Sequence, residues 1–371
     1  MVRHRWTSIL AVAISFQARP TAQDNLQNLQ GPLVTIGDDL HQVRGGAILS
    51  DQRIVIANSG NRELRLYSRD GRLIRTIGRP GEGPAEFRAV TNVIVDAADS
   101  IFVFDWLLRR ISVFSSNGEY ARSVSTAHLT AGVAQPDLIG FFGRNEILVG
   151  LRASIDPTAK PGIQRPEAKY LLIDRQGRIM DTVATVPDAE RWVRHATQAG
   201  AFLTAPLPFG KTTSVAVNSA NIIFADQGSP EIRVVNRRGV VARASKSPWP
   251  SQPLRSSDVE KYKEWRLANV PEVGRAGEQR TLAEVPIPTS SPSFGRVHSA
   301  MTGELLIERF RAVPSDPGEA VLLSRDGRQM LKIRVPAKLE IMWIGEGLLL
   351  ALTKDELDVE AIAVYRIPAV N

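Results

Sequence analysis

The sequence of 371 residues contains no cysteine and only five histidines. Without cysteine the chain can form no disulfide, and it offers no thiol for a lipid anchor. The histidines beyond residue 23 are far apart and lack the spacing of a metal-binding motif; they are His41, His128, His195 and His298. We therefore predict no metal ion and no cofactor, and we expect the hydrophobic core alone to stabilise the protein.

No apolar run is long enough to span a bilayer, so we expect no membrane span. A short run, TSILAVAISF, follows the basic start MVRHRW and precedes the small residues of QARPTAQ. This order is typical of a secretory signal peptide. We expect residues 1–23 to be removed by cleavage near Ala22 or Gln23, which would leave a periplasmic or secreted protein.

Charge of one sign is not concentrated anywhere along the chain. The formal net charge is +7. Arg3, Arg5 and Arg19 of the expected signal peptide account for three of these charges, which leaves +4 on residues 24–371. The remaining basic residues are scattered singly, as on an ordinary solvated surface. We therefore expect no nucleic-acid partner, and we expect a monomer.

Several catalytic motifs are also missing. The sequence has no G-x-S-x-G, no sialidase-type Asp box and no WD signature. The stretch IGRPGEGPAEF, residues 77–87, has the glycines of a phosphate-binding loop, but the β-branched run that follows it cannot start a helix. We interpret this stretch as a sharp connection between two sheets, in which glycines supply positive φ.

A repeat with constant phase runs through the chain. An Asn or Asp lies nine residues before an apolar position, and a Gly follows four residues later. The three full copies are Asn58, Tyr67 and Gly71; Asp105, Phe114 and Gly118; and Asp226, Val235 and Gly239. The second half recurs at Ile173 and Gly177 and at Leu323 and Gly327. Asp-Gly and Asn-Gly pairs between short apolar segments are typical of β-hairpins.

Each copy expands to four short strands, which predicts an all-β fold of four-stranded antiparallel blades, a β-propeller. Five blades fill residues 42–78, 90–125, 136–186, 213–245 and 293–335, and the C-terminal stretch 339–367 supplies only three more strands. The unused strand PLVTIG, 32–37, is expected to complete this sixth blade and close the ring. We therefore predict one six-bladed domain over residues 24–371.

One connection is expected to carry a helix. The insertion at 244–292 contains SSDVEKYKEWRLANV, in which Ser257 and Glu260 have the spacing of a capping box and Pro271 follows the end. We predict one short helix at about 257–269.

These residues resemble a known family. Gly78, Gly81, Gly83, Pro84, Glu86 and Phe87, the blade-ending D/N-G pairs and the closing KDELDVEAIAVYRI are similar to bacterial exported six-bladed β-propellers related to NHL repeats. Ala85 departs from the glycine more usual in that loop. The resemblance implies the fold, and it implies no particular substrate.

In a propeller, the blade-to-blade connections and the turns between second and third strands share one face. The two long insertions, 187–210 and 244–292, fall on this face, and long loops on a rigid scaffold usually have a functional cause. We expect a protein or small-molecule ligand to bind there without chemistry. The residues expected on the binding face are Asn58, Arg79, Asp105, Trp106, Arg109, Asp226, Trp249 and Asp355.

Other interpretations remain open. Asn58, Asp105 and Asp226 could instead cap their turns through their side chains. A metal-dependent hydrolase or lyase could use Asp105 and Asp226 at the channel. A structural module of a cell-envelope assembly is the third possibility.

Overall fold

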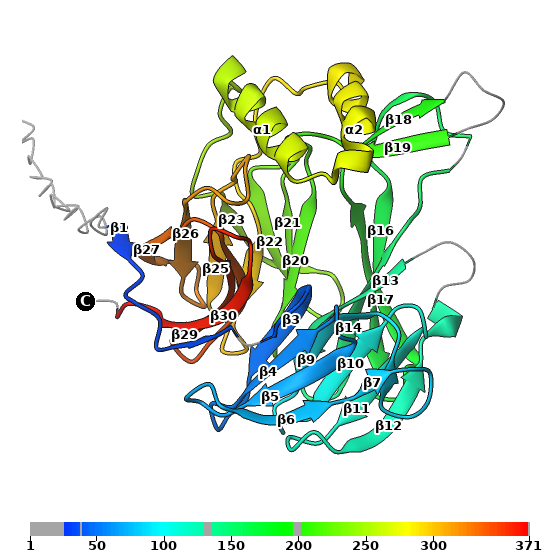
Figure 1. Cartoon of the computed structure of the whole chain (residues 1–371), viewed down its shortest axis with the longest axis vertical. Helices are drawn as coiled ribbons and strands as arrows, with labels where there is room; N and C mark the ends of the chain where they lie inside the picture. The colour runs from blue at the N-terminus through cyan, green and yellow to red at the C-terminus, as the bar shows by residue number, and fades with distance from the viewer. Residues whose placement is uncertain (1–25, 38, 130–134, 157, 196–201, 370–371) are drawn as a thin grey trace, which may run out of the picture.

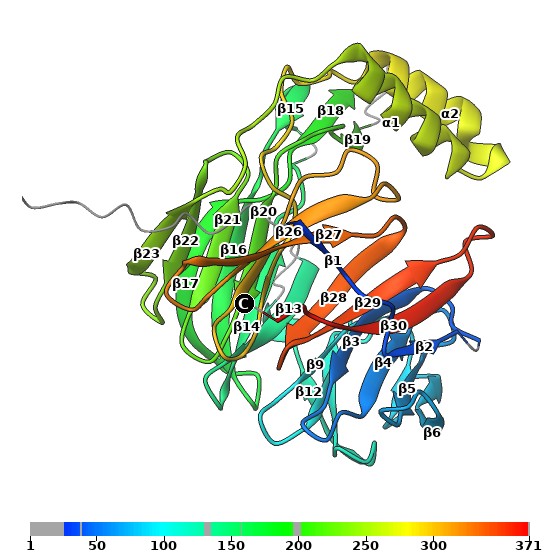
Figure 2. The same cartoon turned by 90° about the vertical axis from the view of Figure 1, so that its left-hand side faces the viewer.

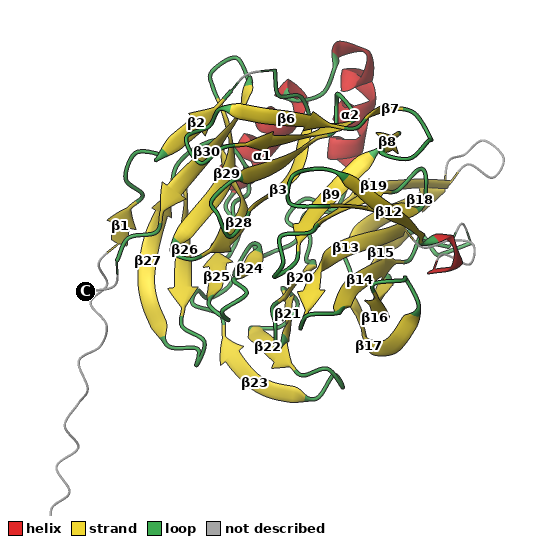
Figure 3. Cartoon of the chain, turned by 90° about the horizontal axis from the view of Figure 1, so that it is seen from below, coloured by secondary structure: helices red, strands yellow, loops and turns green. Residues whose placement is uncertain are grey.

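The computed structural model describes residues 26–37, 39–129, 135–156, 158–195 and 202–369, and the predicted signal peptide lies outside them. Six antiparallel sheets surround a central axis (Figure 3). The innermost strands β3, β9, β13, β20, β24 and β28 each lie against the next one, and β28 lies against β3. The fold is therefore a closed six-bladed propeller, as predicted.

The strands of blades 1 to 4 follow one another along the chain. Blade 1 is β3 to β6: Val43–Ile48, Ile54–Asn58, Glu63–Tyr67 and Leu73–Ile77. Blade 2 is β9 to β12: Val90–Val95, Ile101–Asp105, Arg110–Phe114 and Tyr120–Ser125. Blade 3 is β13, β14, β16 and β17: Gln135–Phe142, Glu146–Arg152, Glu167–Asp174 and Ile179–Pro187. Blade 4 is β20 to β23: Thr213–Val217, Ile222–Asp226, Glu231–Val235 and Val241–Lys246.

The last two blades use strands from both ends of the chain. Blade 5 is β24 to β27: Val297–Ser299, Leu305–Glu308, Gly318–Leu323 and Gln329–Val335. Blade 6 is β28 to β30: Leu339–Gly345, Leu348–Lys354 and Glu360–Arg366. The predicted closing strand is confirmed, because β2 (Val34–Ile36) pairs antiparallel with β30 and places Ile36 opposite Ile362. An unpredicted strand, β1 (Leu26–Asn28), pairs parallel with β27 at the outer edge of blade 5.

The core consists of six clusters, and each lies between two neighbouring blades. One cluster joins blade 6 to blade 1 through Leu350, Ile36 and Ile56, which are at most 3% exposed. The five others fill the remaining gaps around the ring in the same way. Burial of apolar surface at every gap makes each blade depend on both neighbours, so the ring is stabilised as a unit.

The turns between third and fourth strands explain the constant glycine of the repeat. Gly71, Gly118, Gly177, Gly239 and Gly327 have φ between 73° and 84°. In each turn the glycine N–H donates to the carbonyl three residues earlier, at 2.8–3.0 Å. A residue with a Cβ is strained at such φ values, which accounts for glycine at this phase.

A cap covers one face of the ring (Figures 1 and 2). It contains helices α1 (Ser256–Ala268) and α2 (Glu272–Glu284), together with a small sheet of β15 (Gly162–Gln164), β18 (Arg191–His195) and β19 (Phe202–Pro206). Leu207, Leu282 and Val285 form its own buried core, against which Trp192 and Tyr262 pack. The remaining short elements are β7 (Arg79–Pro80), β8 (Glu86–Phe87) and the 3-10 turn Ala127–Leu129.

The helix predicted at about 257–269 is confirmed as α1, which begins at Ser256. The prediction of a single helix was wrong, because the insertion forms a second helix, α2. The N–H of Arg255 donates to the carboxylate of Asp258 at 3.1 Å, so the expected capping box of Ser257 and Glu260 is replaced by one that starts two residues earlier. No helix in the described part of the chain is long and apolar enough to cross a membrane.

Candidate ligand-binding site

Polar residues at the ends of second strands hold the connections of the face under the cap. Asn58 Oδ1 accepts the N–H of His41 at 2.7 Å. The carboxylate of Asp105 accepts the N–H groups of Arg88, at 2.7 Å, and Leu108, at 3.0 Å. Both side chains are fully buried, and these bonds satisfy backbone groups of the loops. The bond from Leu108 caps the turn of Asp105, as the alternative interpretation expects, whereas His41 and Arg88 belong to the connections that precede the two blades.

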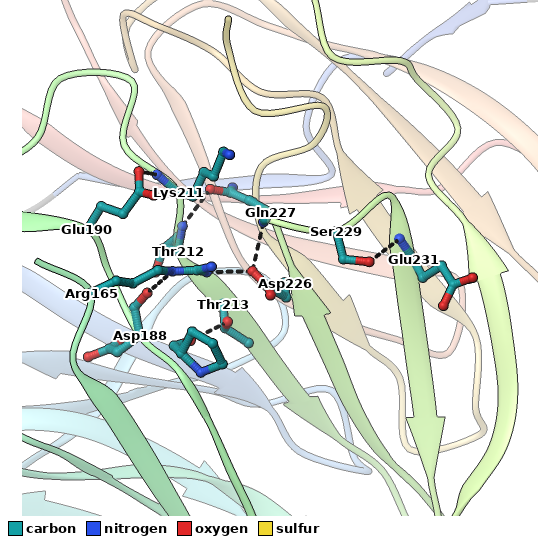
Figure 4. A network of polar contacts seen from close by, with 12 residues as sticks. Arg165, Asp188, Glu190, Lys211, Thr212, Thr213, Asp226, Gln227, Ser229 and Glu231 are labelled. Atoms are coloured by element: carbon teal, nitrogen blue, oxygen red, sulfur yellow. Dashed lines mark hydrogen bonds and ion pairs between the residues drawn. The ribbon is translucent and has the colours of Figure 1, made fainter. Parts of the chain in front are cut away.

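Asp226 and Asp355 are held in a similar way. Asp226 accepts the N–H of Gly228 at 2.7 Å and forms an ion pair with Arg165, which comes from the loop of blade 3 (Figure 4). Asp355 accepts the N–H of Leu357 at 2.8 Å within its own turn. Asp105 and Asp226 lie on different blades and have different partners, so the structure does not bring them together as the ligands of one metal.

The other four residues expected on the binding face are dispersed. Arg79 pairs with Glu86 at 2.8 Å. Trp106 is 41% exposed, and Arg109 accepts the N–H of Thr126 through its carbonyl. Trp249 is 8% exposed and belongs to the core between blades 4 and 5. Its ring therefore packs inward, which corrects the expectation that it presents itself to a partner.

The glycine-rich loop at 77–87 is filled by its own side chain. The carboxylate of Glu86 accepts the N–H of Gly83 at 2.8 Å, and the guanidinium of Arg110 donates to the carbonyls of Gly83 and Glu86. The amide that a phosphate would need is thus already occupied, in agreement with our interpretation of a connection. Ala85 has φ 57°, so it adopts the left-handed conformation in place of the usual glycine.

A cavity of about 720 Å³ opens at the channel mouth on the same face. Five of the six innermost strands line it, through Asn92, Leu138, Val215, Val297 and Met342. Trp265 and Asn269, at the end of α1, contribute to its wall on the side of the cap. None of the eight residues expected on the binding face lines this cavity, although it lies on the predicted face.

The buried carboxylate of Glu308 forms part of the cavity wall at blade 5. Glu308 Oε1 lies 2.8 Å from Nε2 of His298, and Oε2 accepts Nη2 of Arg311 at 3.2 Å. All three side chains are at most 14% exposed. Burial alone would raise the pKa of Glu308, but the hydrogen bond from His298 and the charges of His298, Arg311 and Arg296 hold it below its usual range. A histidine held by a carboxylate can also accept or donate a proton.

The rim of the cavity carries ion pairs that are more exposed. Arg296 pairs with Glu340, and Lys338 pairs with Asp358 at 3.2 Å. In the described ranges, no three His, Asp or Glu side chains converge as metal ligands would. The cavity wall can therefore offer charged hydrogen-bonding groups of both signs to a polar molecule.

Glu308 occupies a position that recurs in other blades, although the nine-residue spacing of the repeat did not reveal it. Glu308 is the last residue of β25, as Asn58, Asp105 and Asp226 are the last residues of β4, β10 and β21. The loop after Glu308 is longer, so its distance to Leu323 is fifteen residues rather than nine. The equivalent residues of blades 3 and 6, Arg152 and Lys354, also line the cavity.

Comparison with known proteins supports the architecture. Residues 32–138 match the DUF5128 family model, described as a six-bladed β-propeller. No curated protein matches the chain in sequence. The solved structure of a DUF4221 family member from Bacteroides vulgatus has a TM-score of 0.50 at 11% identity, with 90% of this chain and 95% of that chain covered.

Two other solved structures have lower scores. A protein described as exported, from Bacteroides fragilis, has a TM-score of 0.48 at 11% identity, with 93% of this chain and 95% of that chain covered. Virginiamycin B lyase from Staphylococcus aureus has a TM-score of 0.41 at 10% identity, with 88% and 95% covered. Likeness at these identities concerns the fold alone. The family model and the six closed sheets agree that the chain is a six-bladed β-propeller.

Proposed function

We propose that the chain is an exported protein that binds a small polar ligand in the cavity at the channel mouth. The observation that carries the proposal is the cavity itself, whose volume of about 720 Å³ is within the usual range of ligand sites. Three of its charged residues, Arg152, Glu308 and Lys354, are the last residues of strands in a closed ring, so they are held rigidly before a ligand binds.

The cap favours a small molecule over a protein partner. Aromatic side chains of the insertions that could anchor a protein partner pack within the protein: Phe209 is 4% exposed and packs against Tyr262, while Trp249 is buried. The cavity wall has six cationic side chains, Arg152, Arg296, Arg309, Arg311, Lys338 and Lys354. It also has four carboxylates, Asp137, Glu308, Glu340 and Asp358. Such a wall suits a ligand with hydrogen-bonding or charged groups.

Filling the cavity should abolish binding. Ser315 is a half-buried loop residue of the cavity wall, and no hydrogen bond of its side chain is present among the described residues. We expect the mature chain to bind members of a mixture of amino acids, sugars, short peptides and nucleotides in ligand-observed NMR, and we expect Ser315→Trp to lose that binding. Ser116→Trp, on the turn of the opposite face, is the matched control. Ligands that bind both variants equally well would contradict the proposal.

We propose export because residues 1–23, which lie outside the described residues, have the pattern of a signal peptide. N-terminal sequencing of the protein recovered from the periplasm or medium of a bacterial host should begin within a few residues of Asp24. Recovery of the chain with Met1 intact, in the cytoplasm only, would contradict export and leave the binding proposal unaffected.

A further inference from the structure

One end of the cavity, at blade 3, is built around a glycine. Asp137 of β13 pairs with Gly150 of β14, and Gly150 pairs in turn with Tyr170 of β16. Residues paired directly across strands project from the same face of a sheet. A Cβ on Gly150 would lie 2.9 Å from the ring of Tyr170, so the ring passes over the glycine in the direction of Asp137. Asp137 and Tyr170 both line the cavity.

A second carboxylate directly follows the last strand of the same blade. Asp188 follows β17 and is only 6% exposed. Its N–H donates to the carbonyl of Pro166. Its own carbonyl accepts a hydrogen bond from Nε of Arg165 at 2.9 Å (Figure 4). Its side-chain Oδ1 is buried and has no hydrogen-bond partner among the described residues. A buried carboxylate oxygen without a donor is costly, so its retention calls for a functional cause.

The charges of this end are unbalanced. Burial raises the pKa of Asp137; Arg152, whose Nη2 lies 3.6 Å from its carboxylate, opposes the increase, and the charge of Asp188 adds to it. Burial likewise raises the pKa of Tyr170, and Asp188 and Asp137 contribute in the same direction. Asp188 follows Pro187, which pairs with Glu167 at the start of β16, the strand that carries Tyr170. Arg152 lies beside Asp137, and Arg165, which bonds the carbonyl of Asp188, is itself paired with Asp226. Three carboxylates are thus set against two guanidinium groups, which leaves one negative charge in excess.

We propose that this end of the cavity binds the protonated amine of the ligand. Asp137 and the hydroxyl of Tyr170 accept hydrogen bonds from the ammonium, and the buried Asp188 supplies a second negative charge. An ammonium has three N–H donors and no acceptor, and one positive charge cancels the excess. This inference rests on the proposed function, because it names a chemical class for the ligand of the same cavity.

An ammonium fits this end better than a metal ion. Calcium takes six to eight oxygen ligands, whereas this end offers two carboxylates and one hydroxyl, with the cation Arg152 beside them. A divalent ion would also exceed the single excess charge and be repelled by the guanidinium.

The test uses amines of matched shape on the mature chain. Butylamine and 1,4-diaminobutane are titrated by ligand-observed NMR beside 1-butanol and 1,4-butanediol, which have the same size without the charge. We expect the amines to bind at least about tenfold more tightly than the alcohols, as hydrogen bonds to charged groups allow. Asp137→Asn should abolish this preference, and Asp188→Asn should reduce it severalfold. Asp156→Asn, on the exposed loop of the same blade, is the control.

Three outcomes would contradict the inference. Equal affinity for amines and alcohols, or a preference that survives Asp137→Asn, would overturn it, and so would competition by Ca²⁺ at equal concentration. Unchanged circular dichroism and melting of Asp188→Asn, whose Oδ1 has no hydrogen-bond partner among the described residues, would show that any loss concerns binding. If amines fail while other ligands still bind in a manner blocked by Ser315→Trp, the inference falls and the proposed function stands.

Discussion

Deletion of residues 26–36 is expected to lower the free energy of unfolding by about 3–5 kcal/mol, because it strips β2 from blade 6. Ile36 is 3% exposed and packs between blades 6 and 1, and the N–H of Leu33 donates to Val364 at 2.7 Å. The exposed edge of β30 should also promote self-association. Denaturant titration and size-exclusion chromatography of the mature and shortened chains measure both effects.

Two variants separate the closing strand from the rest of the segment. Deletion of residues 26–31 removes β1, whose three residues are half-buried or exposed, and Leu29, which packs against the core between blades 5 and 6. It should cost about 1–2 kcal/mol, less than the loss of β2. Ile36→Ala keeps the strand and should still cost about 2–4 kcal/mol through the cavity that it leaves. An unchanged denaturation midpoint in the deletion of 26–36 would show that ring closure does not depend on β2.

Glu308→Gln is expected to destabilise the protein by about 3–5 kcal/mol at neutral pH, because it leaves Arg311 and His298 buried beside an uncharged partner. Glu340→Gln breaks the exposed pair with Arg296 and should cost less than about 1 kcal/mol. Denaturant titration of the two variants provides the comparison. Equal losses would show that the buried cluster carries no special charge interaction.

The contribution of Glu308 should depend on pH with a defined sign. Its pKa in the folded protein lies below the ordinary value of 4.5, so its contribution is fully present above pH 4.5 and is lost as the pH falls through the folded-state pKa. The raised pKa of Asp137 acts in the opposite sense, with a contribution that is present below pH 3.8 and lost at higher pH. Stability of Glu308→Gln should therefore fall less steeply than that of the parent below pH 4.5.

Much of the ring could be predicted because it depends on local chemistry. The turn between the third and fourth strands of a blade needs a glycine with positive φ. This glycine recurs at the same position of the repeat and so reveals the blades in the sequence. The closing strand followed from counting, since blade 6 had three strands and 32–37 was an apolar strand without a blade. Strand β1 was missed because three residues, LQN, carry no alternation of apolar and polar residues that could indicate a strand.

The cap could not be predicted in the same way. Helix α2 contains Gly274 and Gly277, which disfavour a helix, and its N-cap is Pro271, which we took as the end of the first helix. It is held by tertiary contacts instead: Leu282 is buried in the cap, and Glu278 pairs with Arg266 of α1 at 2.6 Å. Packing of this kind overrides local preference, and it leaves no periodic trace in the sequence.

The sequence by itself determined the class of blade, the number of blades, the strand that closes the ring and the face on which the long insertions lie. Only the tertiary structure decided which residues of that face meet. All four of these residues, Asn58, Asp105, Asp226 and Glu308, end the second strand of their blade, yet the side chains of the first three bind loop residues outside the cavity and Glu308 lines it. The reason is physical: the glycine of a hairpin turn is required by the local backbone, whereas a cavity is formed by residues of several blades that only ring closure brings together.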